Sequence, residues 1–190
     1  MSSAVIAIDE ATVQTQVRRW LDKAVIGLNL CPFARAPHVN NRLRLRISQA
    51  TDTDQLLADL SQELTYLADA DPAVCQTTLL VHPRVLGDFL AFNDFQDQAD
   101  AALCALGLEG VLQVASFHPD FLFADEPADD VSHCSNRSPY PILHLLREDD
   151  ISRAVDVLAD PDEIYRRNIA TLRRLGHDGW RALWQDDAEP

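Results

Sequence analysis

Glycine is scarce in this sequence, and the glycine-rich motifs that hold phosphate groups are missing. Only six glycines occur in 190 residues, and none of them forms the G-x-G-x-x-G or Walker pattern. The sequence also lacks H-E-x-x-H and any C-x-x-C pair, the spacings typical of zinc sites. We therefore predict no metal, leaving open only a loose site built from separate strand ends. The sequence indicates no particular cofactor.

Basic residues are few as well. Sixteen Lys and Arg residues stand against thirty Asp and Glu residues, which gives a formal net charge of −14. Such a surface repels phosphate backbones, so we expect no nucleic-acid partner. The four cysteines are widely spaced and are expected to be free thiols in a reducing compartment.

Long hydrophobic runs are also absent. The apolar stretches fall short of the roughly 20 residues that span a bilayer, and the first residues lack the basic region of a signal peptide. These features predict a cytoplasmic protein without a membrane partner. The length, with 47% hydrophobic residues, predicts a single globular domain over residues 1–190, with flexible tails at 1–8 and 185–190. Whether the chain forms a homo-oligomer is left open.

What is present is an alternation of helical and extended patterns. Helices are expected from Asp9 to about Leu28, over residues 51–70 and over residues 86–106, and strands over residues 41–48, 77–83 and 110–119. The predicted fold class is therefore α/β, with a small, mainly parallel sheet of about four strands and helices packed on its faces.

The run "PILHLLR" is too short for its period to separate strand from helix. We interpret it as the fourth strand, because Asp150 is placed to cap a separate helix after it. Reached without a helix, this strand should run antiparallel to the third one. A last helix is expected to begin at the "DPDE" capping box of Asp160 and to end at Gly176.

Two of the expected strands end in the same dipeptide, His-Pro. If these strands are parallel, His82 and His118 both lie at the carboxyl edge of the sheet, where open α/β sheets bind ligands. We assign His82 to ligand binding and His118 to acid–base catalysis. The alternative is that proline simply ends each strand, since it cannot continue the ladder.

The stretch "CSNRSPYPILHLLRE" places many hydrogen-bonding groups beside an apolar run. Its first part should lie next to His118, and four of its residues are predicted to bind ligand: Asn136, Arg137, Ser138 and Tyr140. An arginine fork suits a carboxylate or a phosphate, because both present paired oxygens. The alternative is a proline-rich turn whose polar side chains bond to their own backbone.

Four further residues complete the predicted site. His144 is assigned a catalytic role and Arg147 a ligand-binding role, although their odd separation in a strand lets only one of them face the site easily. Asn168 is an amide on the mostly apolar face of the last helix, flanked by Arg167, and both are assigned to ligand binding. A buried amide needs partners, and backbone groups are the alternative to a ligand.

Cys31 is the candidate nucleophile. In "NLCPFA" the proline can occupy the first position of a helix, which would leave the thiol at a helix N-terminus and lower its pKa. His118 is the first candidate for its base. The alternative is a cysteine that packs as a small hydrophobic side chain.

Four stretches, "GLNLCPFA", "FHPDFLF", "NRSPYPILHLLRE" and "RRNIATLRRLG", together resemble the uncharacterised bacterial family known as domain of unknown function 1415. The resemblance covers about Trp20 to Gly176. The family pattern falls on Cys31, Pro32, His118, Pro119, Asn136, Arg137, Ser138, Pro139, Tyr140, His144, Arg147, Glu148, Arg167 and Asn168. Ser135 stands where the family usually has threonine. The resemblance implies no substrate, cofactor or reaction.

Three functions fit these patterns. The leading hypothesis is an enzyme acting on a small anionic metabolite, a carboxylate or phosphate, that Arg137 binds. The second is a non-catalytic binding or regulatory module that uses the same pocket. The third is a thiol- or metal-dependent redox protein. The first two predict that His118 shares a pocket with Asn136 and Arg137 at the carboxyl edge of the sheet.

Overall fold

The computed structural model describes residues 9–155 and 163–185. The predicted tail 1–8, nearly all of the predicted tail 185–190 and the predicted helix start at Asp160 lie outside these residues. Four strands form one sheet: β1 (Leu43–Ile47), β2 (Thr77–Val81), β3 (Leu112–Phe117) and β4 (Ile142–Arg147). The α/β class, the four strands and the strand interpretation of "PILHLLR" are confirmed.

The sheet is mixed, so the prediction of a mainly parallel sheet is wrong. Its strand order is β1-β2-β4-β3, and only the β1–β2 pair is parallel. β4 runs antiparallel to both β2 and β3, as predicted for its pairing with β3. The physical reason is that the described residues between β3 and β4 form no α-helical crossover, so β4 pairs antiparallel with β3 and, by lying next to β2 as well, makes a second antiparallel pair.

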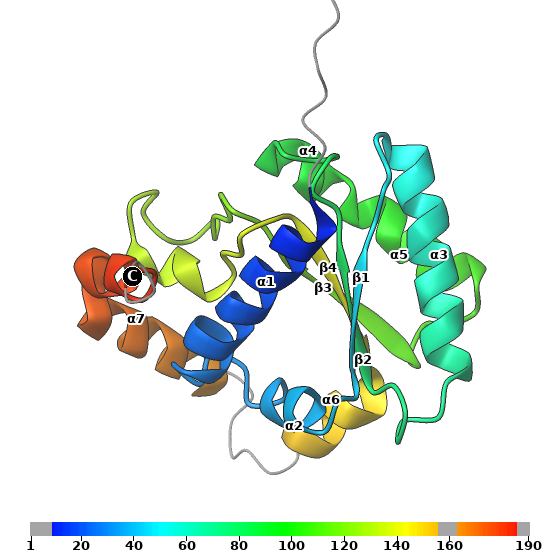
Figure 1. Ribbon diagram of the computed structural model, residues 1–190, viewed down its shortest axis with the longest axis horizontal. Coiled ribbons are helices and arrows are strands. Elements are labelled where there is room, and N and C mark those ends of the chain that lie inside the picture. The colour runs from blue at the N-terminus through cyan, green and yellow to red at the C-terminus, as the bar shows by residue number, and fades with distance from the viewer. Residues whose placement is uncertain (1–8, 156–162, 186–190) are drawn as a thin grey trace, which may run out of the picture.

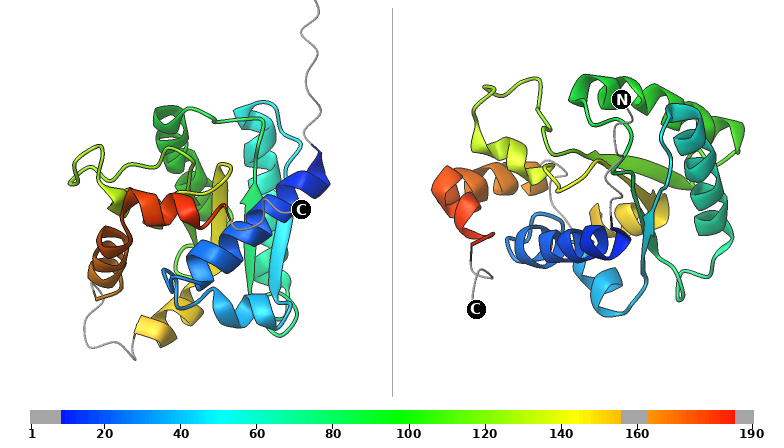
Figure 2. Two further views of the ribbon diagram at one scale, coloured as in Figure 1. Left: turned by 60° about the vertical axis from the view of Figure 1, so that its left-hand side comes forward. Right: turned by 45° about the horizontal axis from the view of Figure 1, so that its top comes forward.

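Helices cover both faces of the sheet (Figures 1 and 2). One face carries α1 (Glu10–Trp20) and its π-helical continuation η1 (Leu21–Ile26), and the other carries α3 (Thr53–Asp69), α4 (Phe89–Asp94) and α5 (Gln96–Ala105). The short α2 (Arg35–Val39) and α6 (Glu148–Val155) lie at one end of the sheet, and α7 (Glu163–Ala182) packs on the 3₁₀ helix η2 (Val131–Ser135).

The two faces of the sheet have separate apolar clusters. Leu80 and Leu143 belong to the cluster under α3 and α5, whereas Leu79 and Ile142 belong to the cluster under α1. Because neighbouring strand residues point to opposite faces, position along a strand decides which helices a side chain meets. This alternation fixes where each predicted site residue points.

The helix boundaries agree with the local signals at some ends and not at others. Asp9 caps α1, its carboxylate accepting hydrogen bonds from the N–H groups of Ala11 and Thr12. The helix expected over 86–106 is divided into α4 and α5. Asp150 is not a cap, because α6 already begins at Glu148. Gly176 breaks α7 with a φ of 70°, but the helix resumes beyond it. No helix within residues 9–155 and 163–185 is long and apolar enough to cross a membrane.

Candidate functional site

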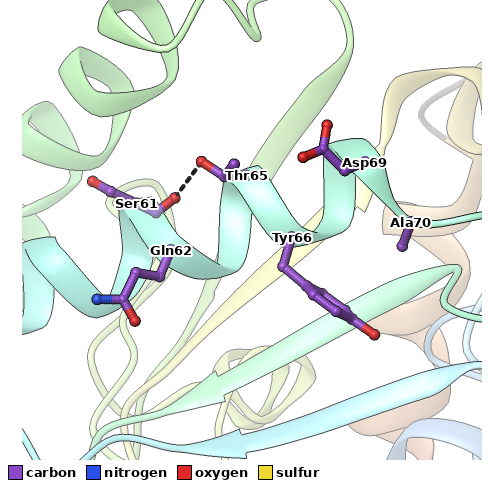
Figure 3. Close-up of a pocket in the computed structure, with 6 residues that line it drawn as sticks. All are labelled: Ser61, Gln62, Thr65, Tyr66, Asp69 and Ala70. Atoms are coloured by element: carbon purple, nitrogen blue, oxygen red, sulfur yellow. Dashed lines mark hydrogen bonds between the residues drawn. The ribbon is translucent and has the colours of Figure 1, made fainter.

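One hollow is an open surface on α3 (Figure 3). It measures about 650 Å³, and its lining consists of Ser61, Gln62, Thr65, Tyr66, Asp69 and the adjoining Ala70. A single helix surface cannot surround a ligand. The Tyr66 ring is already engaged, because the guanidinium of Arg44 lies 4.4 Å from its centroid. Arg44 also forms an ion pair with the buried Glu63. We assign no site here.

A second pocket, of about 430 Å³, lies where α1, the ends of β3 and β4 and the last turns of α7 meet. Its lining residues are Gln16, Arg19, Trp20, Pro119, Arg137, Ser138, Pro139, Trp180 and Trp184. We call it the Arg137 pocket. It is within the size range of small-molecule sites and combines apolar walls with a few polar groups, as such sites do.

The floor of the Arg137 pocket is set by α1. Trp20 belongs to the buried stripe of this helix with Val13 and Val17, and its ring meets Phe117 edge-on at 5.2 Å. Its indole Nε1 donates a hydrogen bond to the backbone oxygen of Arg137 at 2.8 Å. This bond joins α1 to the turn before β4 and fixes the ring relative to Arg137.

The turn before β4 pairs with the end of β3. The N–H of His118 donates to the oxygen of Asn136 at 3.1 Å, and the N–H of Ser138 donates to the oxygen of His118 at 3.4 Å. The Asn136 amide donates to the oxygen of Ser116. The Ser138 hydroxyl donates to the oxygen of Tyr140 at 2.6 Å. The Ser138 bond is of the kind that the alternative of a proline-rich turn predicts, whereas Asn136 bonds to β3 and not to its own turn.

The Arg137 guanidinium is half-buried and only lightly held. Its Nε donates to the oxygen of Phe121 at 3.3 Å, and it also contacts the thiol of Cys134. Because a guanidinium carries five N–H donors, these contacts leave donors for a ligand in the pocket.

The far wall comes from the end of α7. Trp180 and Trp184 meet edge-on with centroids 5.4 Å apart. Arg19 donates to the backbone oxygen of Trp184 at 2.6 Å, and its guanidinium lies 5.9 Å from the centre of that ring. A hydrogen bond and a cation–π contact therefore hold this wall against α1.

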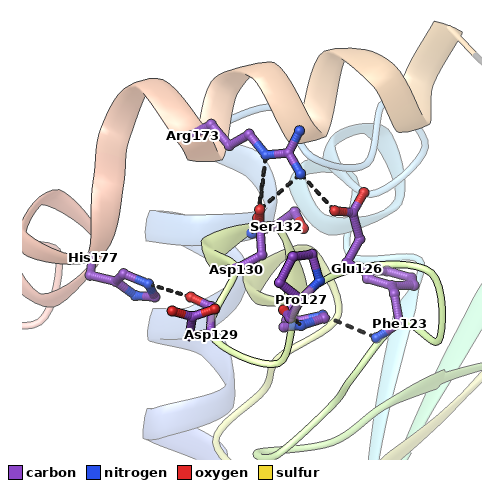
Figure 4. A network of polar contacts seen from close by, with 9 residues as sticks. Phe123, Glu126, Pro127, Asp129, Asp130, Ser132, Arg173 and His177 are labelled. Atoms are coloured by element: carbon purple, nitrogen blue, oxygen red, sulfur yellow. Dashed lines mark hydrogen bonds and ion pairs between the residues drawn. The ribbon is translucent and has the colours of Figure 1, made fainter.

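The acidic loop of residues 124–130 anchors α7 in this position (Figure 4). Arg173 forms ion pairs with Glu126 at 2.6 Å and with Asp130 at 2.8 Å. His177 donates to the backbone oxygen of Asp129 at 2.8 Å. The Arg173 guanidinium holds the pKa of the Asp130 carboxyl well below its usual range. The acidic loop therefore holds α7, the helix that carries Trp180, in place.

His118 does not share the Arg137 pocket, contrary to the prediction. Its ring packs between Phe89 and Phe92 of α4, at 5.5 and 5.1 Å, and is fully buried. Arg137 lines its pocket together with Arg19 of α1. Helix α1 covers the face of the sheet opposite to the face that α4 covers. Only the backbones of His118 and the turn come together.

The other two histidines of the predicted site are also buried. His82 stacks on Phe92 at 5.7 Å, so it lies on the same face as His118. His144 lies on the α1 face, where its Nε2 is 2.7 Å from the hydroxyl of Thr77. Because that hydroxyl donates to the oxygen of Leu145, His144 must be the donor. Burial lowers the pKa of both His82 and His144 to about 4, so each is neutral near pH 7.

The predicted ligand-binding residues outside the turn make backbone contacts. Arg147 points to the face opposite His144, as their odd separation predicts, and donates to three carbonyl oxygens at the end of α3 and in the loop after it. Arg167 donates to the oxygen of Asn29 at 3.0 Å. Asn168 donates to the oxygen of Leu30 at 2.8 Å. None of the three lines the Arg137 pocket.

Cys31 lies in the turn between η1 and α2 and packs against the cluster under α1. The N–H groups of Phe33 and Ala34 and the charge of Arg167 favour its thiolate, but burial has the larger effect and raises its pKa. Helix α2 begins only at Arg35, so Pro32 is not its first residue. The environment is closer to that of a packed cysteine than to that of a nucleophile.

We therefore expect Cys31 to react slowly with iodoacetamide at pH 7.5. Cys104 is exposed and serves as the internal control, which should be alkylated first. Peptide mass spectrometry over a time course would follow the two sites in the same sample. Faster labelling of Cys31 than of Cys104 would show an activated thiol and revive the nucleophile hypothesis.

The comparison with known families agrees with the motifs. A family model described as "Protein of unknown function (DUF1415)" matches residues 12–182. The chain belongs to this family. Searches of curated proteins and of solved structures return no match to this DUF1415 chain.

Sequence reasoning missed most of the pocket of this DUF1415 chain. It selected Arg137 and Ser138 but not Gln16, Arg19, Trp20, Trp180 and Trp184. Trp20 belongs to the buried core, and its indole N–H also bonds to the turn that lines the pocket. A compositional signal was available, since the chain has only three tryptophans. Within the described ranges, no group of three or more His, Cys, Asp or Glu side chains could hold a metal ion.

Proposed function

We propose that this DUF1415 chain binds a small anionic metabolite, a carboxylate or phosphate, in the Arg137 pocket, and that it does so without catalysing a reaction. One observation carries the proposal. The chain has a net charge of −14, yet among the described residues the charged side chains that line this pocket are two arginines, Arg19 and Arg137. The charge of these two side chains is therefore opposite in sign to the net charge of the protein.

The same lining supports binding over catalysis. Among the described residues, the lining includes no His, Cys, Lys, Asp, Glu or Tyr side chain, the groups that usually act as nucleophile or general base. The Ser138 hydroxyl has no base beside it and donates to the oxygen of Tyr140. The candidate catalytic side chains Cys31, His118 and His144 lie outside this lining.

Arg137 is the residue that should contact the anion. Its side chain lines the pocket, whereas Arg19 already holds the backbone and the ring of Trp184. A guanidinium can pair with both oxygens of a carboxylate or with two oxygens of a phosphate. The Tyr140 hydroxyl donates a hydrogen bond to the side-chain oxygen of Gln16 at 2.6 Å. The amide nitrogen of Gln16 is not used in this bond, so it can supply a second donor to the anion.

Replacing Arg137 with leucine should leave the fold standing and weaken anion binding about 100-fold, which is the effect of one or two charge-assisted hydrogen bonds. The single bond to Phe121 is long at 3.3 Å, so we expect a loss of stability within about 1 kcal/mol. Thermal melts with a panel of carboxylates and phosphates would identify ligands, and calorimetry would give their affinities.

The matched control is Arg18→Leu, which removes the same charge from an exposed position of α1 outside the pocket lining. It should bind the panel as the parent does. The proposal fails if no panel member binds the parent chain, or if Arg137→Leu and Arg18→Leu bind equally well.

A further inference from the structure

All three tryptophans of the chain line the Arg137 pocket. Trp20 lies in the N-terminal helix, and Trp180 and Trp184 lie about 160 residues later, yet they meet around one cavity. Pro119 and Pro139 complete the apolar part of the wall. Flat ring faces and proline surfaces suit a planar apolar group, because aromatic rings prefer offset or edge-to-face contacts with other rings.

We propose that the ligand is an aromatic monocarboxylate, whose ring lies among Trp20, Trp180 and Trp184 while its carboxylate meets Arg137. This inference rests on the proposed anion binding and adds the class of ligand. It does not require any reaction of the ligand.

The number of available cations favours one negative group. Arg19 is committed to Trp184 through a hydrogen bond of 2.6 Å and through its position over the ring. The guanidinium of Arg137 is then the one that a ligand can pair with, and one guanidinium pairs with one carboxylate through two parallel hydrogen bonds. A polyphosphate would bring several charges and would meet only one uncommitted guanidinium.

The Trp20 ring and the backbone of Arg137 are fixed relative to each other. The Trp20 indole donates to the backbone oxygen of Arg137 itself at 2.8 Å, so the two recognition elements are joined by one hydrogen bond. Trp20 is only 3% exposed and cannot move far. A ligand that carries its ring close to its carboxylate can therefore meet both elements at once, with little loss of side-chain freedom.

Packing alone does not account for Trp180 of α7 and for Trp184, which lies just after this helix. Both are only partly buried, although they contact the cluster under α1. Their partly exposed rings line the same pocket as Arg137. A purely structural contact would not need the cavity of about 430 Å³ that remains between them and the turn.

The test compares four probes by calorimetry on the full chain: two carboxylates, an uncharged amide and inorganic phosphate. Indole-3-acetate carries a ring and a carboxylate, cyclohexylacetate replaces the aromatic ring with a saturated one, and indole-3-acetamide removes the charge. Indole-3-acetate should bind about 10-fold more tightly than cyclohexylacetate, as one or two aromatic contacts would give. Indole-3-acetamide and inorganic phosphate should bind more weakly than either carboxylate.

A variant pair separates the ring from the fold. Trp184→Leu should remove the preference for indole-3-acetate over cyclohexylacetate, whereas Trp184→Phe, which keeps an aromatic face, should retain most of it. Tryptophan fluorescence gives a second readout for cyclohexylacetate, which carries no indole of its own, since every tryptophan lines this pocket. Both variants should remain folded, because the backbone oxygen that Arg19 contacts is unchanged. Melting curves would check this.

The outcomes distinguish this inference from the proposed function. Equal affinity for indole-3-acetate and cyclohexylacetate, with loss of both in Arg137→Leu, would overturn the aromatic preference and leave anion binding standing. Stronger binding of inorganic phosphate than of either carboxylate would do the same. Binding of none of the probes and of no anion in the wider panel would overturn both.

Discussion

Replacing Arg147 with methionine is expected to lower the free energy of unfolding by about 3–5 kcal/mol. Its Nη2 donates to the backbone oxygens of Leu67, Ala70 and Cys75 at 2.6, 2.7 and 3.1 Å. These carbonyls lie in the last turn of α3 and in the loop after it, where a helix leaves its oxygens without intrahelical partners. Methionine fills similar space but satisfies none of them.

Urea unfolding at pH 7.5 would measure the loss, and the melting temperature should fall on the order of 10 °C. The control is Arg153→Met on α6. Arg153 is 72% exposed and pairs with Asp150 within the same helix, so its loss should stay within about 0.5 kcal/mol. If the two variants were equally stable, Arg147 would not be holding α3, and its family motif position would need another explanation.

The elements of the fold were largely predictable because their signals are local. The alternation of Leu43, Leu45 and Ile47 with arginines gives an edge strand, and Asp9 gives a helix start, from residues within a few positions of one another. The order of the sheet was not predictable in this way. β4 lies between β2 and β3 because both of its faces are buried by helices from distant parts of the chain. Such a position depends on the competition among all strands, which no window of the sequence contains.

The candidate site shows the same division. The turn around Arg137 was located correctly at the carboxyl edge of β3, because an antiparallel strand that follows β3 must begin there. The prediction that the His118 side chain shares a pocket with this turn was wrong. His118 points to the α4 face, whereas Arg137 lines a pocket on the α1 face. Neighbouring residues along β3 point to opposite faces of the sheet, so the position at which β3 ends decides the face that His118 meets. Trp180 belongs to α7, which the ion pair between Arg173 and Asp130 holds in place. This ion pair joins segments over 40 residues apart.

Mild acid is expected to destabilise the fold strongly between about pH 6.5 and pH 4. His82 and His144 are buried and neutral, and burial lowers the pKa of each from 6.5 to about 4. The unfolded chain therefore binds protons in this window that the folded chain does not. The cost should reach about 2 kcal/mol for each histidine at pH 5 and about 3 kcal/mol at pH 4. His118 adds in the same direction, because burial lowers its pKa as well.

Carboxylates act in a different window. The pKa values of Asp9 and Asp130 are lowered by hydrogen bonds in the fold, so their contribution is present above the unfolded pKa and is lost only as the pH falls below about 4. Urea unfolding at pH 7.5, 6 and 5 thus isolates the histidines. Repeating the series in 0.5 M NaCl should change little, because salt screens exposed charges but not the cost of burying one.

His144→Gln tests the assignment of this pH dependence to individual histidines. A glutamine amide can still donate to the Thr77 hydroxyl but does not titrate, so the variant should lose about 2 kcal/mol less than the parent chain between pH 7.5 and pH 5. The remaining loss should come mainly from His82, whose Nε2 has no hydrogen-bond partner among the described residues and whose protonation the surrounding apolar side chains oppose. An unchanged dependence in the variant would mean that His144 is reached by water in solution. A parent chain equally stable at pH 5 and pH 7.5 would contradict the burial of both rings.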